Sequence, residues 1–559
     1  MGQTAPAFDV TEYSDGDTQT DGPPGTGAFQ RAVDACAEAG GGTVRVPSGE
    51  YDIGTLRLRS DVTLHLDAGA TVAATTDPTE YDERSDRHFE VPFIVARGAE
   101  NVAITGRGEF DGRAREFLDL DTPIKYHGSE PHPEYPLVSN GPHEARQGEA
   151  YIDASQGTDD WPVAKTDFRP TRLFRFVDCE NVQISGVTMA DMPSHTVSLL
   201  RCAEVDVRGV DIVGHRLVPN NDGIAVADSR NVHISDCTVV TCDDSIVFDG
   251  TPDPDYPCEN VTVTNCTLES SACAIKFGSR TDGVMRDFTF QNIVVTDTNR
   301  ALGIQHRDSG VLENVLFSDV LIQTRLPSGP WWGKAEPIYV TCVPRDDDTE
   351  AGTVRNVRFS NVVAQCENGA LIYGSEEATI ENVSFENVRL EIGASENSDR
   401  VGGNFDLQPT SAVPPIFGSD IAGVHCEGAT GVDLEDVTVE WVESGGTTAN
   451  AVDGLPDYYT HGLQCVDVSD LSIRGFDGRQ AHPDSDAGAI ALRDVETVSI
   501  RDSRARPGTG RFLELDGVSD PRLFAGNDLT DADASGLADE SGDGSGDEGF
   551  ATSGNRLPE

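Results

Sequence analysis

The stretch that decides the fold is Glu180-Asn-Val-Gln-Ile184, because close copies of it recur along most of the chain. Each copy places a turn residue before Val, a polar residue and Ile or Phe. Alternation of apolar and polar residues with a period of two indicates a β-strand with one buried face. The copies are Glu100-Asn-Val-Ala-Ile104, Glu204-Val-Asp-Val207, Arg230-Asn-Val-His-Ile234, Glu259-Asn-Val-Thr-Val263, Glu313-Asn-Val-Leu-Phe317, Arg355-Asn-Val-Arg-Phe359 and Glu381-Asn-Val-Ser-Phe385, with later ones at Gly431-Val-Asp-Leu434, Asp470-Leu-Ser-Ile473 and Thr497-Val-Ser-Ile500.

The spacing of these copies selects the architecture. The anchor residues Val182, Val205, Val232 and Val261 are 23, 27 and 29 residues apart. That is too short for a strand–helix–strand unit of about 30 residues with a regular helix, but it suits one coil of a β-solenoid. A propeller blade needs about 40–50 residues, and hairpins would show regular Asn-Gly turns. We therefore predict an all-β fold, a parallel β-helix whose coils stack about 4.8 Å apart.

The ends and interruptions of the repeat define the predicted domain organisation. Residues 27–39 form an amphipathic pattern that ends at Gly40-Gly41-Gly42, which predicts a short capping helix within an N-terminal cap of residues 8–42. One solenoid domain is expected over residues 1–534, and the acidic Gly/Ser-rich tail, 535–559, is expected to be disordered. Loops on one face of a solenoid usually carry the binding site. The expected insertions are residues 113–168, 325–350, 392–428 and 441–465.

Charge excludes several kinds of partner. The chain has 96 acidic and 41 basic residues, for a net charge of −55. This charge opposes binding to nucleic acid or to an anionic membrane, and no 18-residue apolar run predicts a membrane span. Only four basic residues are lysines: Lys125, Lys165, Lys276 and Lys334. An acidic, lysine-poor surface is typical of proteins from salt-loving organisms, where molar salt screens self-repulsion.

The cysteines and the N-terminus bear on location. Twelve cysteines are scattered through the repeats without zinc-ligand spacing, so we interpret them as small buried apolar residues. This use of cysteine fits a reducing cytoplasm, and residues 1–10 show no signal-peptide pattern. A cytoplasmic location is expected, with secretion left open. Neither a cofactor nor a metal is expected, and the oligomeric state is not indicated.

Two acidic motifs carry the predicted chemistry. Asn220-Asn221-Asp222-Gly223 is followed by Asp243-Asp244, with Asp222 and Asp243 separated by 21 residues, about one coil. Stacking is expected to place Asp222 beside Asp243, and a turn or bulge is expected to bring Asp244 into the same cleft. Three neighbouring carboxylates oppose full ionisation, so one can serve as an acid while another activates water. Glycoside hydrolysis needs this combination.

The same motifs carry a resemblance to the polygalacturonase family, glycoside hydrolase family 28. Its Asn-Thr-Asp matches Asn220-Asn221-Asp222, its Asp-Asp matches Asp243-Asp244, and Arg169-Pro170 is also typical of it. The stretches Gly40-Gly-Gly-Thr-Val-Arg-Val-Pro47 and Val62-Thr-Leu-His-Leu-Asp-Ala-Gly-Ala70 extend the likeness over most of residues 8–390. The resemblance implies a right-handed, pectate-lyase-like β-helix and hydrolysis with inversion. It implies Asp243 as general acid, with Asp222 and Asp244 holding the attacking water.

Two departures from the family alter the expected substrate. Ala272-Cys273-Ala274 stands where the family has Gly-His-Gly, and Gly303-Ile304-Gln305 stands where it has Arg-Ile-Lys. Plain polygalacturonase activity is therefore in doubt, and a rhamnogalacturonan-type pectic fragment becomes the expected carbohydrate partner. His195 and His215 are interpreted as structural. The residues expected to bind substrate are Asn220, Lys276, Gln305, His306, Arg307, Trp332 and Lys334, with Trp331 beside Trp332.

Two other functions fit the fold. A calcium-dependent polysaccharide lyase would abstract a proton and leave an unsaturated product, although the chain has no Asp-x-Asp-x-Asp-Gly calcium loop. A non-catalytic carbohydrate-binding β-helix would not need the two acidic motifs.

Overall fold

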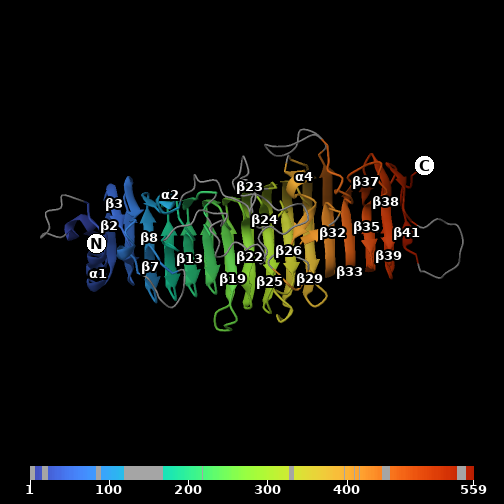
Figure 1. The fold of residues 1–559 in the computed structure, drawn as a ribbon. Coiled ribbons are helices and arrows are strands. Elements are labelled where there is room, and N and C mark those ends of the chain that lie inside the picture. Colours follow the sequence, from blue (N-terminus) through green and yellow to red (C-terminus); the bar gives the residue numbers. More distant parts are fainter. Residues whose placement is uncertain are drawn as a thin grey trace, which may run out of the picture. The chain divides into compact units, whose positions relative to one another are not determined.

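The computed structural model describes most of the chain. The described residues are 7–14, 23–82, 90–118, 168–216, 218, 220–326, 333–395, 397–407, 410–413, 416–418, 420–442, 454–537 and 549–558. They divide into two compact units, which meet in sequence between Ser271 and Ala272. Each unit is a right-handed parallel β-helix, with its strands in successive coils (Figure 1). The predicted fold class is confirmed.

Unit 1 begins with the predicted cap. Helix α1 spans Thr26–Glu38, and its apolar face, with Phe29, Val33 and Cys36, is fully buried. The helix contacts strands β1 (Ala7–Asp9) and β2 (Gly42–Val46). It therefore covers the apolar edge of the first coil, which would otherwise be exposed to water.

The coils of unit 1 each contain three strands, and equivalent strands pair in parallel. The second strands are in the register predicted from the sequence, with Val182, Val205, Val232 and Val261 stacked in one row. Along these second strands, buried inward side chains alternate with more exposed outward ones. These strands are β11 (Glu180–Ser185), β14 (Ala203–Arg208), β17 (Arg230–Ser235) and β20 (Cys258–Thr264).

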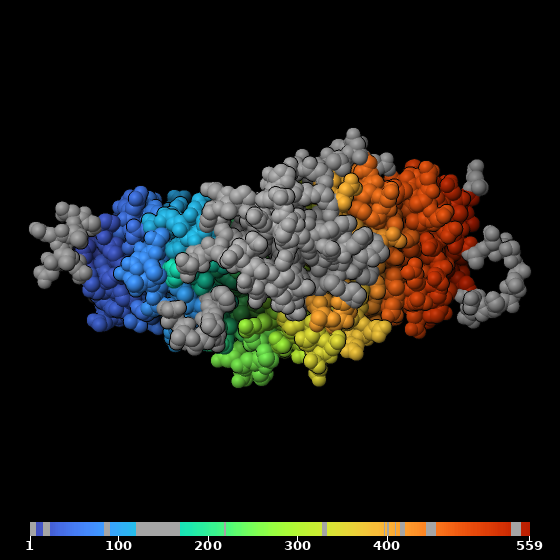
Figure 2. Space-filling view, viewed as in Figure 1, coloured from blue at the N-terminus to red at the C-terminus, as the bar shows by residue number. Residues whose placement is uncertain are grey.

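The loops between coils position the site. They join the third strand of one coil to the first strand of the next. The third strands are β12 (Thr188–Ala190), β15 (Asp211–Val213), β18 (Thr238–Thr241) and β21 (Thr267–Ser270). The first strands are β10 (Phe174–Val177), β13 (Val197–Leu200), β16 (Ile224–Ala227) and β19 (Ile246–Gly250). A further loop, residues 251–257, connects β19 to β20 and projects from the surface of unit 1 (Figure 2, green).

Asparagine ladders stabilise one corner of the coils. The Asn181 amide donates to the Asn101 side-chain oxygen at 2.7 Å, and Asn260 donates likewise to Asn231 at 3.0 Å. All four residues have φ between 55° and 57°, a left-handed conformation that asparagine tolerates better than most residues. The repeated asparagine before the anchor valine is therefore explained by the corner it forms.

Unit 2 continues the same repeat with longer strands. Val315, Val357, Val383 and Val432 occupy one row of its ladder. Beside that row, the rings of Phe290, Phe317 and Phe359 stack with centroids 4.6 and 5.1 Å apart. The strands are β23 (Val284–Thr298), β25 (Val311–Thr324), β27 (Thr353–Cys366), β29 (Thr379–Ile392), β32 (Val424–Trp441) and β33 (Leu463–Arg474).

Several boundaries differ from the sequence-based expectation. Strand β26 (Ile338–Cys342) lies within the expected insertion 325–350, and the expected insertions 392–428 and 441–465 include the first residues of β32 and β33. Strand β41 (Ala551–Ser553) pairs with β39 (Pro521–Ala525), so this part of the tail expected to be disordered forms a strand. Strands β26 and β41 are short and lack the repeat pattern, so the sequence did not reveal them.

The cysteines are buried and unbonded, as expected from their positions in the repeats. All twelve belong to the described residues, and each has a free thiol. Among the described residues, no helix is long and apolar enough to cross a membrane.

Candidate active site

Unit 1 brings the three predicted aspartates together. Asp222 lies in the loop between β15 and β16, and Asp243 and Asp244 lie in the turn between β18 and β19. Each offers a carboxylate oxygen, and these three oxygens lie within 4.8 Å of one another. Asp222 is 7% exposed and Asp244 is 2% exposed, so the cluster is largely withdrawn from bulk water.

The register within the cluster differs from the expectation. Ile224 pairs with Ile246, and the Gly223 N–H donates to the Asp244 carbonyl at 2.9 Å. Continuing this ladder places Asp222 beside Asp244, whereas stacking by residue count had suggested Asp243. The count of 21 residues missed this because the chain bends at residues 242–243 before the next strand begins.

Hydroxyl groups fix the bend that presents Asp243. Its backbone carbonyl accepts hydrogen bonds from Thr241 Oγ1 at 2.6 Å and from Ser270 Oγ at 2.7 Å. Its side chain accepts the Asp244 backbone N–H at 3.1 Å. These bonds hold consecutive aspartates in one cluster although alternate residues of a regular strand point to opposite faces.

Asn221 anchors the loop that carries Asp222. It is fully buried, and its amide donates to the carbonyls of Met192 and Ser194 at 3.0 and 3.2 Å. A Cβ at Gly214 would lie 2.1 Å from the Asn221 side-chain oxygen, so only glycine fits there. The residue between the two predicted site residues Asn220 and Asp222 therefore determines the shape of the loop.

Arg216 ties the same loop to the following coils. Its guanidinium donates to Ser271 Oγ at 2.9 Å, to Glu269 at 2.6 Å and to the Ser270 carbonyl at 3.1 Å. The Ser271 hydroxyl donates in return to the Arg216 carbonyl at 3.0 Å. Since Ser270 also holds Asp243, this contact couples the positions of Asp222 and Asp243.

His195, which the sequence analysis interpreted as structural, is a neighbour of Asp222. Its Nε2 lies 3.4 Å from Asp222 Oδ1. Burial, together with Arg172, Arg169 and Arg175, lowers the pKa of His195 to about 3, so the imidazole is neutral near pH 7. The 27-residue step from His195 to Asp222 equals that from Val205 to Val232, and this signal could have revealed the contact.

Arg169 supports the exposed residue Asn220. Its guanidinium donates to the Pro193 carbonyl at 2.8 Å and to the Asn220 side-chain oxygen at 3.3 Å. Asn220 has φ 56°, which an asparagine accepts. Arg169 therefore helps to fix the outer rim of the loop beside Asp222.

The other predicted binding residues belong to unit 2. Lys276 is 8% exposed, Gln305 2%, Arg307 6% and Lys334 0%. Trp332, and Trp331 beside it, lie outside the described residues. These side chains are thus placed in the second unit, with the aspartate cluster in the first.

His306, one of the residues expected to bind substrate, is enclosed within unit 2 and carries no positive charge near pH 7. It is fully buried, its Nε2 hydrogen bonds the Gly310 carbonyl at 2.9 Å, and burial lowers its pKa to about 4. A neutral imidazole results near pH 7.

The departure at Gly303 has a steric cause. A Cβ at Gly303 would lie 2.8 Å from Cys273 Sγ and 3.2 Å from Arg300 Cδ. Arg300 is 3% exposed, and its ion pair with the fully buried Glu336, at 3.0 Å, neutralises its charge. A side chain at position 303 would therefore collide with these buried groups.

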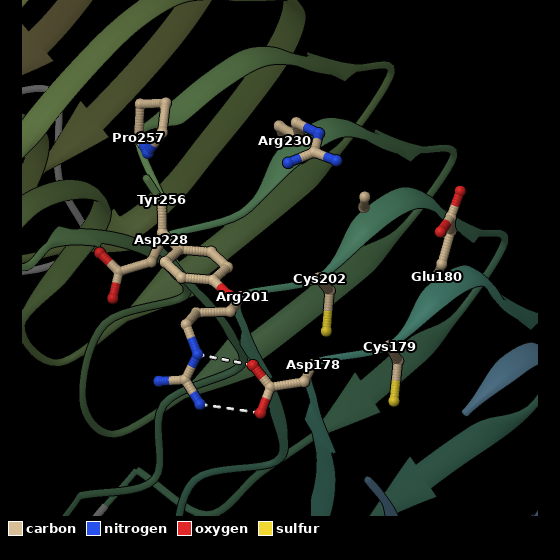
Figure 3. A pocket seen from close by; sticks show the side chains of 10 residues that line it. Asp178, Cys179, Glu180, Arg201, Cys202, Asp228, Arg230, Tyr256 and Pro257 are labelled. Carbon is tan, nitrogen blue, oxygen red and sulfur yellow. Dashed lines mark hydrogen bonds and ion pairs between the residues drawn. The ribbon is translucent and has the colours of Figure 1, made fainter. Parts of the chain in front are cut away.

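A second hollow in unit 1 lies at the opposite ends of the same strands. Asp222 precedes β16, whereas Asp228, which lines this hollow, follows it. Figure 3 shows Arg201 directed at Asp178, with bonds of 2.6 and 2.9 Å, and beside the ring of Tyr256, 5.6 Å from its centroid. Arg201 and Asp178 therefore neutralise each other here, and the aspartate cluster lies elsewhere.

Comparison with known proteins shows what this chain resembles. The family model described as "Glycosyl hydrolases family 28" matches residues 138–402. The chain is 26% identical to an exo-poly-alpha-D-galacturonosidase of Dickeya chrysanthemi, over 53% of this chain and 51% of the relative. It is 24% identical to an exopolygalacturonase of Zea mays, over 43% of this chain and 48% of the relative. The chain thus spans about half the length of these curated relatives.

Solved structures of similar fold include two polygalacturonases. The exopolygalacturonase of Thermotoga maritima has a TM-score of 0.49 and 20% identity, over 81% of this chain and 96% of that one. The polygalacturonase of Erwinia carotovora has a TM-score of 0.49 and 19% identity, over 72% and 95%. The family model and the curated relatives show that this chain is similar to glycoside hydrolases of family 28 and to polygalacturonases.

Proposed function

We propose that this protein hydrolyses glycosidic bonds in pectic fragments of galacturonate or rhamnogalacturonan type, with inversion at the anomeric carbon. The observation that carries the proposal is the cluster of Asp222, Asp243 and Asp244, whose oxygens lie within 4.8 Å of one another. Asp243 is assigned as the general acid. Asp222 and Asp244, neighbours on the ladder, hold the water that attacks.

The separation of the carboxylates bears on the stereochemistry. Inverting enzymes typically separate acid and base by about 6.5–9.5 Å, and retaining enzymes by about 5–5.5 Å. Nearest oxygens within 4.8 Å can be bridged by one water at ordinary hydrogen-bond distances of about 2.7 Å. The same limit holds for Asp243, so the assignment of Asp222 and Asp244 to the water, and of inversion, follows the family resemblance.

The substrate assignment rests on the sequence of residues 303–305. Gly303-Ile304-Gln305 does not present the two cations that a galacturonate on the leaving-group side would require, and an unpaired buried carboxylate is costly. The Gln305 amide suits neutral hydroxyls. We therefore assign a neutral sugar such as rhamnose to that side, unless Lys276, Lys334 or Arg307 supplies the missing charge.

One experiment tests the reaction class. Pectic oligosaccharides, both homogalacturonan and rhamnose-containing, are incubated with the protein in high salt, and the products are followed by NMR. Hydrolysis should give a reducing end whose first-formed anomer is inverted. A first-formed anomer of retained configuration would contradict inversion, and no turnover on any substrate would favour a carbohydrate-binding protein.

The same aspartate cluster supports one alternative, a calcium-dependent lyase, because three carboxylates could also hold a cation. A lyase would give an unsaturated product with ultraviolet absorbance, and a chelator would abolish its activity. Hydrolysis that persists in chelator without such absorbance would reject this alternative.

A further inference from the structure

Arginines outnumber carboxylates in a buried group of unit 1. Glu90, 6% exposed, accepts hydrogen bonds from Arg97 and Arg175, each at 3.0 Å. Arg175, 4% exposed, also donates to Ser198 Oγ at 2.9 Å, and Arg172 donates to the same oxygen at 3.2 Å. We call these five residues the arginine cluster. It contains three guanidinium groups and one carboxylate.

Arginines outnumber the carboxylates near the arginine cluster, even though Asp178 also lies within electrostatic reach of Arg97 and Arg175. Burial and the nearby Arg172 lower the pKa of Arg175 to about 10, which shows that the positive charge there is disfavoured. The Arg175 Nε is buried and has no hydrogen-bond acceptor among the described residues. In a chain with a net charge of −55, two guanidinium groups converging on one neutral hydroxyl form a local excess of positive charge. An anion would relieve the repulsion and accept the remaining N–H groups.

The ladder places this excess in line with the aspartates. The Leu173 N–H donates to the His195 carbonyl at 2.9 Å, and the Thr196 N–H donates to the Asp222 carbonyl at 2.8 Å. Continuing the β10–β13 register therefore aligns Arg172 with His195, which is next to Asp222. Arg172 lies two coils from Asp222, a backbone separation of about 10 Å.

His195 lies between the arginines and Asp222 and carries no charge near pH 7. Its pKa of about 3 keeps it neutral; its Nδ1 lies 3.3 Å from Ser194 Oγ and its Nε2 lies 3.4 Å from Asp222 Oδ1, so a sugar hydroxyl at Nε2 would also lie beside Asp222. A sugar bound over Asp222 and His195 would extend its neighbour toward Arg172 and Arg175.

We propose that Arg172 and Arg175, joined at Ser198, determine specificity by binding the carboxylate of a uronic acid residue adjacent to the sugar over Asp222. The planar guanidinium fork matches a carboxylate in a way that a lysine does not. This inference rests on the proposed hydrolase function and adds which residues of unit 1 recognise the charge.

Binding is measured apart from turnover. The full-length Asp243→Asn protein is titrated calorimetrically, at fixed high salt, with trigalacturonate and with its methyl ester, which lacks the charge. Trigalacturonate should bind at least about tenfold more tightly, the value of one charge-assisted interaction. Adding Arg172→Gln should remove that preference, and Arg172→Lys should restore part of it. Arg208→Gln, which removes the same charge from an exposed position on β14, should leave the preference unchanged.

The possible outcomes distinguish a failure of the arginine-binding inference from a failure of the proposed hydrolase function. A preference that persists in Arg172→Gln, or no preference for the acid in the parent, would overturn the inference. Ser198→Ala provides a second variant if Arg172→Gln fails to fold, because it removes the shared hydroxyl and should weaken trigalacturonate binding selectively. Wild-type hydrolysis of neutral oligosaccharides alone would also overturn the inference while leaving the hydrolase intact. Arginine-dependent binding without turnover of any substrate would instead reject the proposed function.

Discussion

Asp222 lies beside Asp244 on adjacent coils, with the Gly223 N–H donating to the Asp244 carbonyl at 2.9 Å. Asp243 joins them from the bend that precedes β19, where Thr241 and Ser270 hold its carbonyl. The backbone ladder thus positions Asp222 and Asp244, whereas hydrogen bonds in a turn position Asp243. Mutations can therefore disturb Asp243 separately from the other two aspartates.

Replacement of the proposed acid should abolish most activity. Asp243→Asn keeps the shape of the side chain but cannot donate a carboxylic proton, so kcat should fall by about 10²-fold or more. Steady-state hydrolysis of the best pectic oligosaccharide measures the change. Asp211→Asn, at an exposed position on β15, is the matched control and should retain wild-type rates. Near-wild-type activity of Asp243→Asn would contradict the assignment.

Loss of the Arg216 contact should disturb the site without removing a reacting group. Arg216→Met deletes bonds to Glu269, Ser271 and the Ser270 carbonyl, which should reduce the free energy of unfolding by about 2 kcal/mol. Because Asp222 and Asp243 lose their common support, kcat should fall while KM changes little. Denaturant unfolding and kinetics measure the two effects. An unchanged kcat together with reduced stability would limit Arg216 to a structural role.

Acid should destabilise unit 2 through His306. Its folded pKa is lowered to about 4, below the unfolded value of about 6.5. Stability from this group is therefore complete above pH 6.5 and is lost as the pH falls from about 6.5 toward 4. His306→Gln, which can keep a donor for the Gly310 carbonyl, should show a smaller loss of Tm over that range. Parallel pH dependences of Tm for the two proteins would refute this contribution.

The fold should require salt. The net charge is −55, and the screening length grows from about 3 Å at 1 M to about 30 Å at 0.01 M ionic strength. Dilution should therefore lower the Tm through repulsion among acidic side chains. Thermal unfolding in molar and millimolar NaCl tests this, with sucrose as an uncharged stabiliser for comparison. Equal Tm values would contradict an origin in a salt-loving organism.

The sugar on the leaving-group side can be identified by substrate comparison. If Gln305 contacts a neutral sugar there, rhamnose-containing oligosaccharides should be cut well and homogalacturonan poorly. If Lys276, Lys334 or Arg307 supplies the missing positive charge, homogalacturonan should be cut. Lys334→Met or Arg307→Met should then raise KM or lower kcat steeply. Efficient cleavage of homogalacturonan that is insensitive to Lys276→Met, Lys334→Met and Arg307→Met would exclude both options.

The repeat was predictable because one row of valines defines it. The steps between Val182, Val205, Val232 and Val261 in the sequence became a row of paired residues in the structure. The neighbour of Asp222 was not predictable by residue count, since the bend before β19 changes the register. The arginine cluster was also missed, because Glu90 and Arg175 are 85 residues apart and neither belongs to a motif.

The ladder also limits how this protein can evolve. Every site residue of unit 1 owes its neighbours to coil order, and one inserted coil adds about 4.8 Å along the stack. Duplication of a coil before Glu90 would lengthen the molecule and keep its chemistry. The same duplication between Asp222 and Asp243 would separate the carboxylates. Length variation among natural homologues should therefore concentrate at the ends, with the central coils inherited as an indivisible block.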